Sequence, residues 1–405
     1  DEVIRREFRQ FESSWYNADK VKLSRDRVDR LGYFKEVTVD TPESQGTSDQ
    51  VDVNLKVEEK PTGNFMIGGA FSQAEKFTFT MSVQQANFAG SGNTIGAELN
   101  TSKYSRTIAF SEMNPYFTDD GVSRAFQLYL RTTRPPALNI GAYTVKQQGG
   151  NLTFGVPFSE NDTVYFGAGL ERTMIETDQT SPTVYKNFVI QNGGPATGIG
   201  TARTHAIPLT VAWGRDTRDS AITPTVGRYQ RANLEVDAIG DAKYYRAIYE
   251  QQWYRPITRW MTLALKGELD YGHGLSGSKY PIFKNFYAGG IGSVRGYQSS
   301  SLGVVDPFYG DALGGAKRII GNAELQFPFP GSGKDRSLRW FTFLDGGQVY
   351  QEGQKMRLNE LRYSAGIGLS WISPVGPLKL SYAKPLNALP GDRLERFQFQ
   401  MGTGF

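Results

Sequence analysis

The feature that most constrains this chain is an alternation of apolar and polar side chains, with a period of two residues, that recurs from residue 64 to residue 405. Such alternation is typical of strands that have one apolar and one polar face. The polar faces carry charges and glutamine even in long segments, and turn residues separate the segments. The clearest example is the segment 262–271, in which Leu263, Leu265, Leu269 and Tyr271 alternate with Thr262, Lys266, Glu268 and Asp270. We therefore expect a large antiparallel β structure.

The hydropathy of the chain is compatible with a membrane β-barrel. No uninterrupted apolar run reaches 18 residues, which excludes a membrane-spanning helix. A membrane barrel needs no such run, because its strands alternate lipid-facing and lumen-facing residues and keep the mean hydropathy low. Aromatic residues make up 13% of the chain, and 46 of its 405 residues are glycine. This composition suits aromatic girdles and tight turns, although a soluble β-sandwich could share it.

Several classes of function are disfavoured by composition. The chain has no cysteine, which removes disulfides and thiolate metal sites, and its net charge of +4 is too small and dispersed to indicate nucleic-acid binding. Its two histidines, His205 and His273, lie far apart without a nearby carboxylate cluster. The glycine-rich segment 331–334 lacks the spacing of a phosphate-binding loop. We expect no enzyme, no metal and no cofactor.

The first 60 residues have a different pattern. Apolar residues at helical spacing predict a helix from Ile4 to Trp15, and Ser24 is a candidate cap for a second helix that runs to Leu31. Two strands follow, the second of them in the alternating segment 51–58. Residues 1–60 are therefore expected to form a small α+β module, with 61–63 as a linker. The helix-first order suggests that a strand preceding residue 1 has been removed.

Turns divide the region 64–405 into about 16 strands of ~9–11 residues each. An even number of strands would return both ends of the barrel to the side of the N-terminal module. Long connections are expected at 177–204 and 272–316. Short turns, expected at the other end of the barrel, are predicted at 89–93, 118–121, 159–162, 239–241, 256–258 and 373–376.

Four motifs are spread along the chain, at residues 31–34, 215–227 and 289–297 and in the last strand. Leu31-Gly32-Tyr33-Phe34 is similar to the helix-to-strand corner of a POTRA module, and the segment 289–297 ends in Val294-Arg295-Gly296-Tyr297. The segment 215–227 contains Asp-Thr-Arg-Asp followed by Pro-Thr-Val-Gly, and the last strand is rich in Phe and ends on Phe405. Together these motifs resemble the BamA family of outer-membrane barrel-assembly proteins and its secretion relatives, over essentially the whole chain.

The resemblance implies a transmembrane antiparallel β-barrel over 64–405, whose loop 272–316 folds inward, preceded by a POTRA module that lacks its first strand. It also implies a bacterial outer membrane location with the module in the periplasm. The expected function is a core insertase that folds and inserts β-barrel proteins. The implied partners are unfolded outer-membrane client proteins, outer-membrane lipids, assembly lipoproteins and periplasmic chaperones.

Arg295 is the leading candidate within the loop motif. It is either a solvated loop arginine or an arginine folded into the lumen, where its planar fork suits carboxylates. The family's partners correspond to Glu324 and Asp345. Alternation places Glu324 on the lumenal face with Asn322 and Gln326, whereas Asp345 shares its face with Phe341 and Phe343 and is not placed inside by the pattern. We expect a structural lock on the loop rather than a catalytic site.

The second candidate site is the seam, where the first strand must pair with the last to close the barrel. Glycines weaken strands, so this seam either opens laterally or simply curves. Opening would expose an edge for an incoming strand. The seam residues are Phe65, Gly68, Gly69, Phe397, Phe399, Gly402, Gly404 and Phe405.

Three functions remain open: an insertase, a two-partner-type polypeptide secretion pore, and a passive porin or ligand-binding barrel. The POTRA-like module disfavours the third, because a simple channel needs no periplasmic docking domain.

Overall fold

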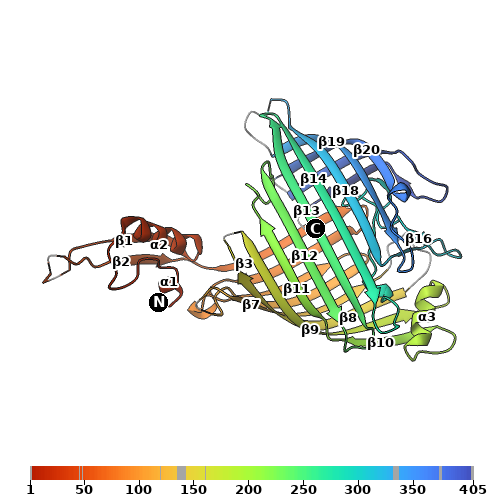
Figure 1. The fold of residues 1–405 in the computed structure, drawn as a ribbon, viewed down its shortest axis with the longest axis horizontal. Helices are drawn as coiled ribbons and strands as arrows, with labels where there is room; N and C mark the ends of the chain where they lie inside the picture. The colour runs from red at the N-terminus through yellow and green to blue at the C-terminus, as the bar shows by residue number, and fades with distance from the viewer. Residues whose placement is uncertain are drawn as a thin grey trace.

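The structure is a computed structural model that describes residues 2–44, 46–47, 49–118, 120–134, 143–159, 161–331, 337–373 and 376–402. A small N-terminal module lies beside one end of a large β-barrel (Figure 1). No helix in the described part of the chain is both long enough and apolar enough to cross a membrane.

The module contains α1 (Glu2–Arg5), α2 (Ala18–Arg30) and the paired strands β1 (Phe34–Asp40) and β2 (Asn54–Glu59). Its core consists of Val3, Val28, Tyr33 and Phe34. The predicted first helix is wrong in length, because α1 ends at Arg5.

The cap predicted for the second helix is also wrong. Asn17 caps α2 by accepting hydrogen bonds from the backbone N–H groups of Asp19 and Lys20. Ser24 lies inside this helix, where its hydroxyl accepts a hydrogen bond from the backbone N–H of Arg9 at 2.8 Å. The serine thus fixes the loop between the two helices instead of starting the second one.

The module contacts the first two turns at the near end of the barrel. Tyr33 donates a hydrogen bond to the carbonyl oxygen of Gly92 at 3.4 Å, and Arg27 donates to the Tyr116 hydroxyl at 3.0 Å. The guanidinium of Arg6 stacks on the ring of Tyr116 at 4.6 Å from its centroid.

Over the described residues, sixteen antiparallel strands close the barrel, in agreement with the sequence estimate. Two segments, β10 and β11, count as one strand because both pair with β9 on either side of Ile207 and Pro208. The strands are β3 (Gly63–Ser72), β4 (Lys76–Gln85), β5 (Thr94–Thr101), β6 (Ser105–Asn114), β7 (Ser123–Thr133), β8 (Tyr143–Pro157), β9 (Asp162–Thr177), β10 (Gly200–Ala206), β11 (Leu209–Asp216), β12 (Gly227–Asp237), β13 (Tyr244–Thr258), β14 (Met261–Gly274), β18 (Lys317–Pro328), β19 (Leu338–Tyr350), β20 (Arg362–Ser373), β21 (Gly376–Pro385) and β23 (Phe397–Met401).

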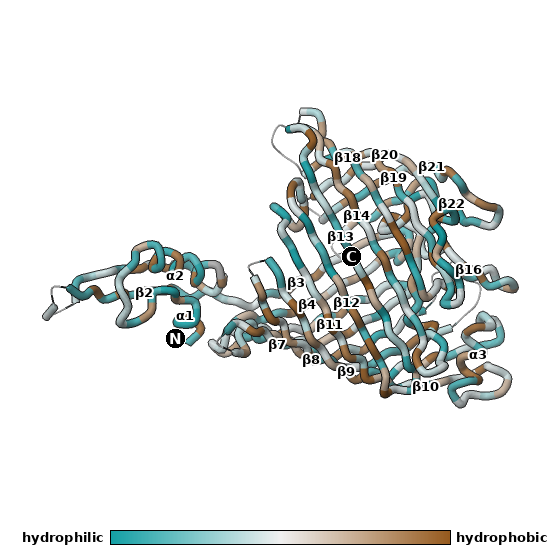
Figure 2. Tube along the Cα trace, in the orientation of Figure 1, coloured by the Kyte–Doolittle hydropathy of each residue, from teal (hydrophilic) through white to brown (hydrophobic). Residues whose placement is uncertain are grey.

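The alternation in the sequence separates the two faces of this wall. Figure 2 shows apolar and polar residues succeeding one another along the barrel strands. Large apolar side chains remain exposed on the outside, including Leu170, Val211, Leu269 and Ile367. A lipid-facing surface explains this exposure, since a water-soluble protein rarely leaves so continuous an apolar belt uncovered.

Two predicted turns are misplaced. The turn at 239–241 lies at the far end of the barrel, because β12 runs away from the module and β13 returns toward it. The turn predicted at 256–258 belongs to β13, and the chain reverses at Arg259 and Trp260 instead. The connection 178–199, which contains α3 (Thr183–Gln191), lies at the far end with the loop 275–316 (Figure 1).

Candidate functional site

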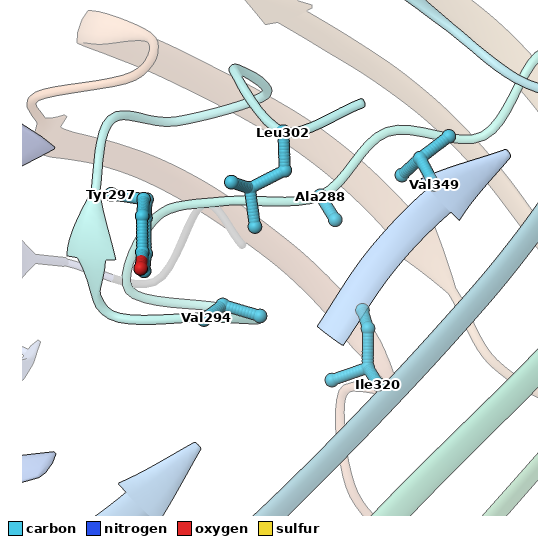
Figure 3. Close-up of a cluster of buried hydrophobic side chains, with 6 residues drawn as sticks. All are labelled: Ala288, Val294, Tyr297, Leu302, Ile320 and Val349. Atoms are coloured by element: carbon cyan, nitrogen blue, oxygen red, sulfur yellow. The ribbon is translucent and has the colours of Figure 1, made fainter. Parts of the chain in front are cut away.

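The loop 275–316 contains several short elements of its own: η2 (Ile282–Lys284), β15 (Gly296–Tyr297), β16 (Val304–Val305) and β17 (Ala312–Gly314). Its own bridges, such as Ala288 to Leu302, fold it into a compact unit. Figure 3 shows Val294, Tyr297 and Leu302 of this loop gathered with Ile320 and Val349 of the barrel wall. This apolar cluster holds the loop against β18 and β19.

Arg295 is buried inside the barrel, with 2% of its surface exposed. Its Nε and Nη2 atoms each donate to the Asp345 carboxylate at 2.6 Å, and its Nη1 donates to Glu324 at 2.6 Å. The guanidinium lies over the ring of Phe343, 3.6 Å from the centroid. This bidentate and stacked geometry requires an arginine, because a lysine ammonium offers neither the planar fork nor the same stacking.

The structure brings Asp345 into the lumen together with the phenylalanines of its strand. Asp345 is fully buried, and its cross-strand partner is Asn322, whose side-chain amide donates to it at 2.8 Å. Phe341 and Phe343 lie on the same face of β19 as Asp345. The contact of both rings with the guanidinium of Arg295 shows that this face points into the lumen. The two aromatic rings are therefore part of the arginine site, which apolar–polar alternation alone could not reveal.

The local structure also explains why the other motif residues suit their positions. Gly296 has φ +87°, and a Cβ there would lie 3.0 Å from the Cβ of Ala383. A side chain at this position would be strained both by the backbone conformation and by this neighbour. Val294 and Tyr297 are fully buried in the cluster of Figure 3.

The loop motif also binds the last strand of the barrel. Gln398 of β23, 1% exposed, donates to the carbonyl oxygen of Tyr297 at 2.8 Å, and β15 pairs with β22 (Leu394–Glu395). The backbone N–H of Gln298 donates to the carbonyl oxygen of Arg393 at 2.9 Å. Sequence reasoning missed Gln398, and its only signal was a glutamine on the polar face of the last strand.

A second polar anchor, also missed, lies at Lys284. Its ammonium, on a side chain that is 9% exposed, is 3.1 Å from Glu171 of β9 and 3.2 Å from Glu235 of β12. Tyr129 donates a hydrogen bond to Glu171 at 2.6 Å, and Tyr244 donates one to Glu235. Lys284 and Arg295 thus attach one loop to different parts of the wall.

Replacing Lys284 with methionine should leave two buried carboxylates without their cation. We expect this to cost about 3 kcal/mol, because removing one partner of a buried ion pair is strongly destabilising. The measurement is the midpoint of heat denaturation, followed by the mobility of the folded barrel in gels. Lys355→Met, on an exposed loop, is the matched control and should leave the midpoint unchanged. Equal midpoints for the two variants would contradict an anchoring role.

The seam between β23 and β3 is short over the part of the chain that the structure describes. Among the described residues it consists of the pairs Gln400–Ser72 and Met401–Phe71, supplemented by a stack of Phe71 on Phe399 with centroids 5.4 Å apart. The Gln73 side chain extends the contact by donating to the carbonyl oxygen of Phe397 at 3.1 Å. By comparison, β3 and β4 pair from Gly63–Gln85 through to Ser72–Lys76.

The structure brings together only some of the predicted seam residues. Phe65 is 57% exposed and, like Gly68 and Gly69, pairs with β4 rather than with described residues of β23. Gly402 has φ +109°, and a Cβ there would collide with Ala70 and with the carbonyl oxygen of Gly69. Phe397 and Phe399 lie in β23. Gly404 and Phe405 lie outside the described residues.

Each histidine has one carboxylate neighbour in the structure. His205 lies 3.1 Å from Asp241, and His273 lies 2.8 Å from Glu352. The partners come from other turns of the barrel, so sequence distance concealed them. Within the described ranges no group of three or more histidine or carboxylate side chains could hold a metal ion.

Fold and site together define an outer-membrane β-barrel with a POTRA module and a lumenal loop arginine. The Omp85 superfamily domain model matches residues 87–405, and a POTRA model, described as surface antigen variable number repeat, matches residues 1–60. The chain belongs to the Omp85 superfamily, and it is an outer-membrane barrel whose module lies in the periplasm.

Its relatives include the outer membrane protein assembly factor BamA of Neisseria meningitidis serogroup B, 37% identical over the whole chain, which covers 55% of that protein. BamA of Nitratidesulfovibrio vulgaris is 27% identical over the whole chain, which covers 49% of it. The chain therefore spans about half the length of these curated relatives.

Solved structures give the same picture. BamA from Haemophilus ducreyi lacking POTRA domains 1–3 superposes with a TM-score of 0.90 at 28% identity, covering all of this chain and 81% of that one. CdiB from Escherichia coli has a TM-score of 0.63 at 12% identity, covering 99% of this chain and 73% of that one, which shows a shared barrel fold and no more.

Proposed function

We propose that this chain is the membrane part of an insertase that folds β-barrel proteins into the outer membrane through its seam. The observation that carries the proposal is the short pairing of β23 with β3 over the residues that the structure describes. A backbone hydrogen bond contributes about 0.5–1.5 kcal/mol net, so the two residue pairs that the described residues form across the seam cost only a few kcal/mol to open. Relatives named assembly factor BamA support the same function.

The backbone groups of β3 on the seam side would bind the client strand. On the seam side, the segment 63–70 of β3 has no ladder partner among the described residues, while its other side pairs with β4. An unfolded client strand would satisfy these N–H and C=O groups by strand addition. The step uses no catalytic residue, cofactor or nucleotide.

The partners in this proposal are unfolded outer-membrane client proteins and the surrounding lipids, with assembly lipoproteins and periplasmic chaperones delivering clients to the module. A two-partner-type secretion pore is the alternative, since CdiB shares the fold. The insertase is favoured because relatives that match the whole chain are named assembly factor BamA, whereas CdiB, at 12% identity, shares the fold alone.

The test uses the full-length parent protein in liposomes, with an unfolded client barrel added and its folding followed by heat-modifiable gel mobility. The proposal expects client folding well above that in empty liposomes. Folding no faster than in empty liposomes, together with ion conductance and passage of a secreted polypeptide, would instead establish the secretion pore.

A further inference from the structure

Five residues form a basic surface on the outside of the barrel, at its periplasmic rim. They are Arg215, Arg228, Gln230, Trp253 and Arg255. Its outward orientation follows from strand register. Glu324 binds Arg295 in the lumen and pairs with Ala264, which pairs with Tyr254. These side chains face inward, so their neighbours along β13, Trp253 and Arg255, face outward.

The same register extends the surface onto two further strands. Arg228 of β12 is the cross-strand partner of Trp253, Gln230 is the partner of Gln251, and Arg215 of β11 is the partner of Gln230. Together they line an open cavity of about 500 Å³. Its position at the start of β12 and the end of β11 places it at the end of the barrel nearest the N-terminal module.

The basic surface is adjacent to the apolar belt. Trp213 of β11 and Leu234 of β12 lie farther from the periplasmic rim and share the outward face of Arg215 and Arg228. Leu265, the partner of Trp253, continues this apolar face on β14. The arginines thus lie where the hydrocarbon region of a membrane meets its headgroups, the level at which tryptophan is enriched.

The nearby carboxylates are already engaged. Asp216 accepts hydrogen bonds from Nε and Nη2 of Arg218 at 2.9 and 2.8 Å. Asp219 caps its own turn by accepting from the hydroxyl and backbone N–H of Thr225 and from the backbone N–H of Val226. Although partial burial opposes the effect, these hydrogen bonds hold the pKa of Asp219 below its usual value.

The three outward arginines therefore keep an excess of positive charge. Asp162 lies 3.9 Å from Arg215, at the limit of an ion pair. Arg228 and Arg255 have no carboxylate partner in the described part of the chain, and their Cζ atoms lie 5.9 and 6.0 Å from the Trp253 ring. Neither guanidinium donates a hydrogen bond to another described residue, so their N–H donors remain available to a ligand.

We propose that this basic surface binds the phosphate of an anionic phospholipid, of the phosphatidylglycerol type, in the periplasmic leaflet. Guanidinium forks suit phosphate oxygens, and Gln230 offers an amide to the headgroup. The acyl chains would lie on Trp213, Leu234 and Leu265. A lipid is the expected occupant because the site faces the bilayer and continues into an apolar surface.

The experiment is native mass spectrometry of the whole chain in detergent micelles with added phosphatidylglycerol or phosphatidylcholine. The wild-type protein should retain phosphatidylglycerol about tenfold more strongly than phosphatidylcholine, and Arg228→Gln with Arg255→Gln should remove this preference. The control is Arg106→Gln, an outward arginine at the opposite rim, which should keep it. Heat-modifiable mobility verifies that each variant is folded.

The proposal does not depend on the insertase activity, because lipid retention is measured without a client. Equal retention of phosphatidylglycerol by the wild type and the double variant would overturn it. Displacement of the lipid by an equimolar amount of inorganic phosphate would also overturn it, since the surface would then be a simple anion site. A double variant that still folds clients but loses the lipid preference would support it.

Discussion

Replacing Arg295 with methionine is expected to lower client folding by about tenfold or more and to release the loop from β18 and β19. The substitution removes the cation that Asp345 and Glu324 share, so Asp345 loses its cation and Glu324 keeps only the ammonium of Lys379, 3.5 Å away. Breaking a buried ion pair in this way typically costs about 3–5 kcal/mol. Client folding in liposomes measures the first effect, and hydrogen exchange of residues 294–302 measures the second.

The matched control is Arg295→Lys, which keeps the charge but loses the bidentate fork and the stacking on Phe343. It should lie between the wild type and Arg295→Met in both measurements. If Arg295→Met left exchange protection and client folding at wild-type values, the lock would not exist. If only exchange changed, the lock would be real but unrelated to insertion.

The sequence predicts the barrel well because alternation is a local property of each strand. Leu265, for example, faces lipid because its strand places apolar residues on one face, whichever residues of the neighbouring strands it pairs with. The strand estimate succeeds for this reason even though Ile207 and Pro208 divide one strand into β10 and β11. Turn positions fail more often, because β13 continues through the apolar–polar pattern as far as Thr258 before it reverses.

The site is less predictable because its contacts join residues that are far apart in the chain. Arg295 and Glu324 could be proposed from a motif and from parity, but Lys284 meets Glu171 and Glu235 only after the loop folds. Gln398 likewise meets Tyr297 across 101 residues of chain. Nothing in the local pattern distinguishes these polar side chains from others on the lumenal face.

The contact between Gln398 and Tyr297 makes the loop and the seam one structural unit. The last strand is held on one side by β21, where Phe397 pairs with Tyr382, and from inside the lumen by the loop. Among the described residues, its ladder with β3 is shorter than its ladder with β21. An opening between β23 and β3 can therefore leave the last strand folded, which is what a template for an incoming client strand requires.

A disulfide across the seam is accordingly expected to reduce client folding to the level of empty liposomes. Residues 1–405 contain no cysteine, so Ser72→Cys with Gln400→Cys introduces the only two in this part of the protein. These residues are direct antiparallel partners, so their Cα atoms lie at ~4.5–5.5 Å, within the range of a disulfide. The measurement is client folding in liposomes before and after reduction, and the reductant should restore the activity.

The control is Ser82→Cys with Glu98→Cys, which joins the neighbouring strands β4 and β5 at another directly paired position. Those strands already pair from Phe79–Thr101 to Gln85–Ile95, so a covalent bond between them constrains nothing that must open. Loss of activity in the oxidised seam variant but not in this control would tie insertion to movement of β23 away from β3. Full activity of the oxidised seam variant would mean that clients enter the membrane elsewhere, and the short pairing of the seam would then be a matter of barrel curvature alone.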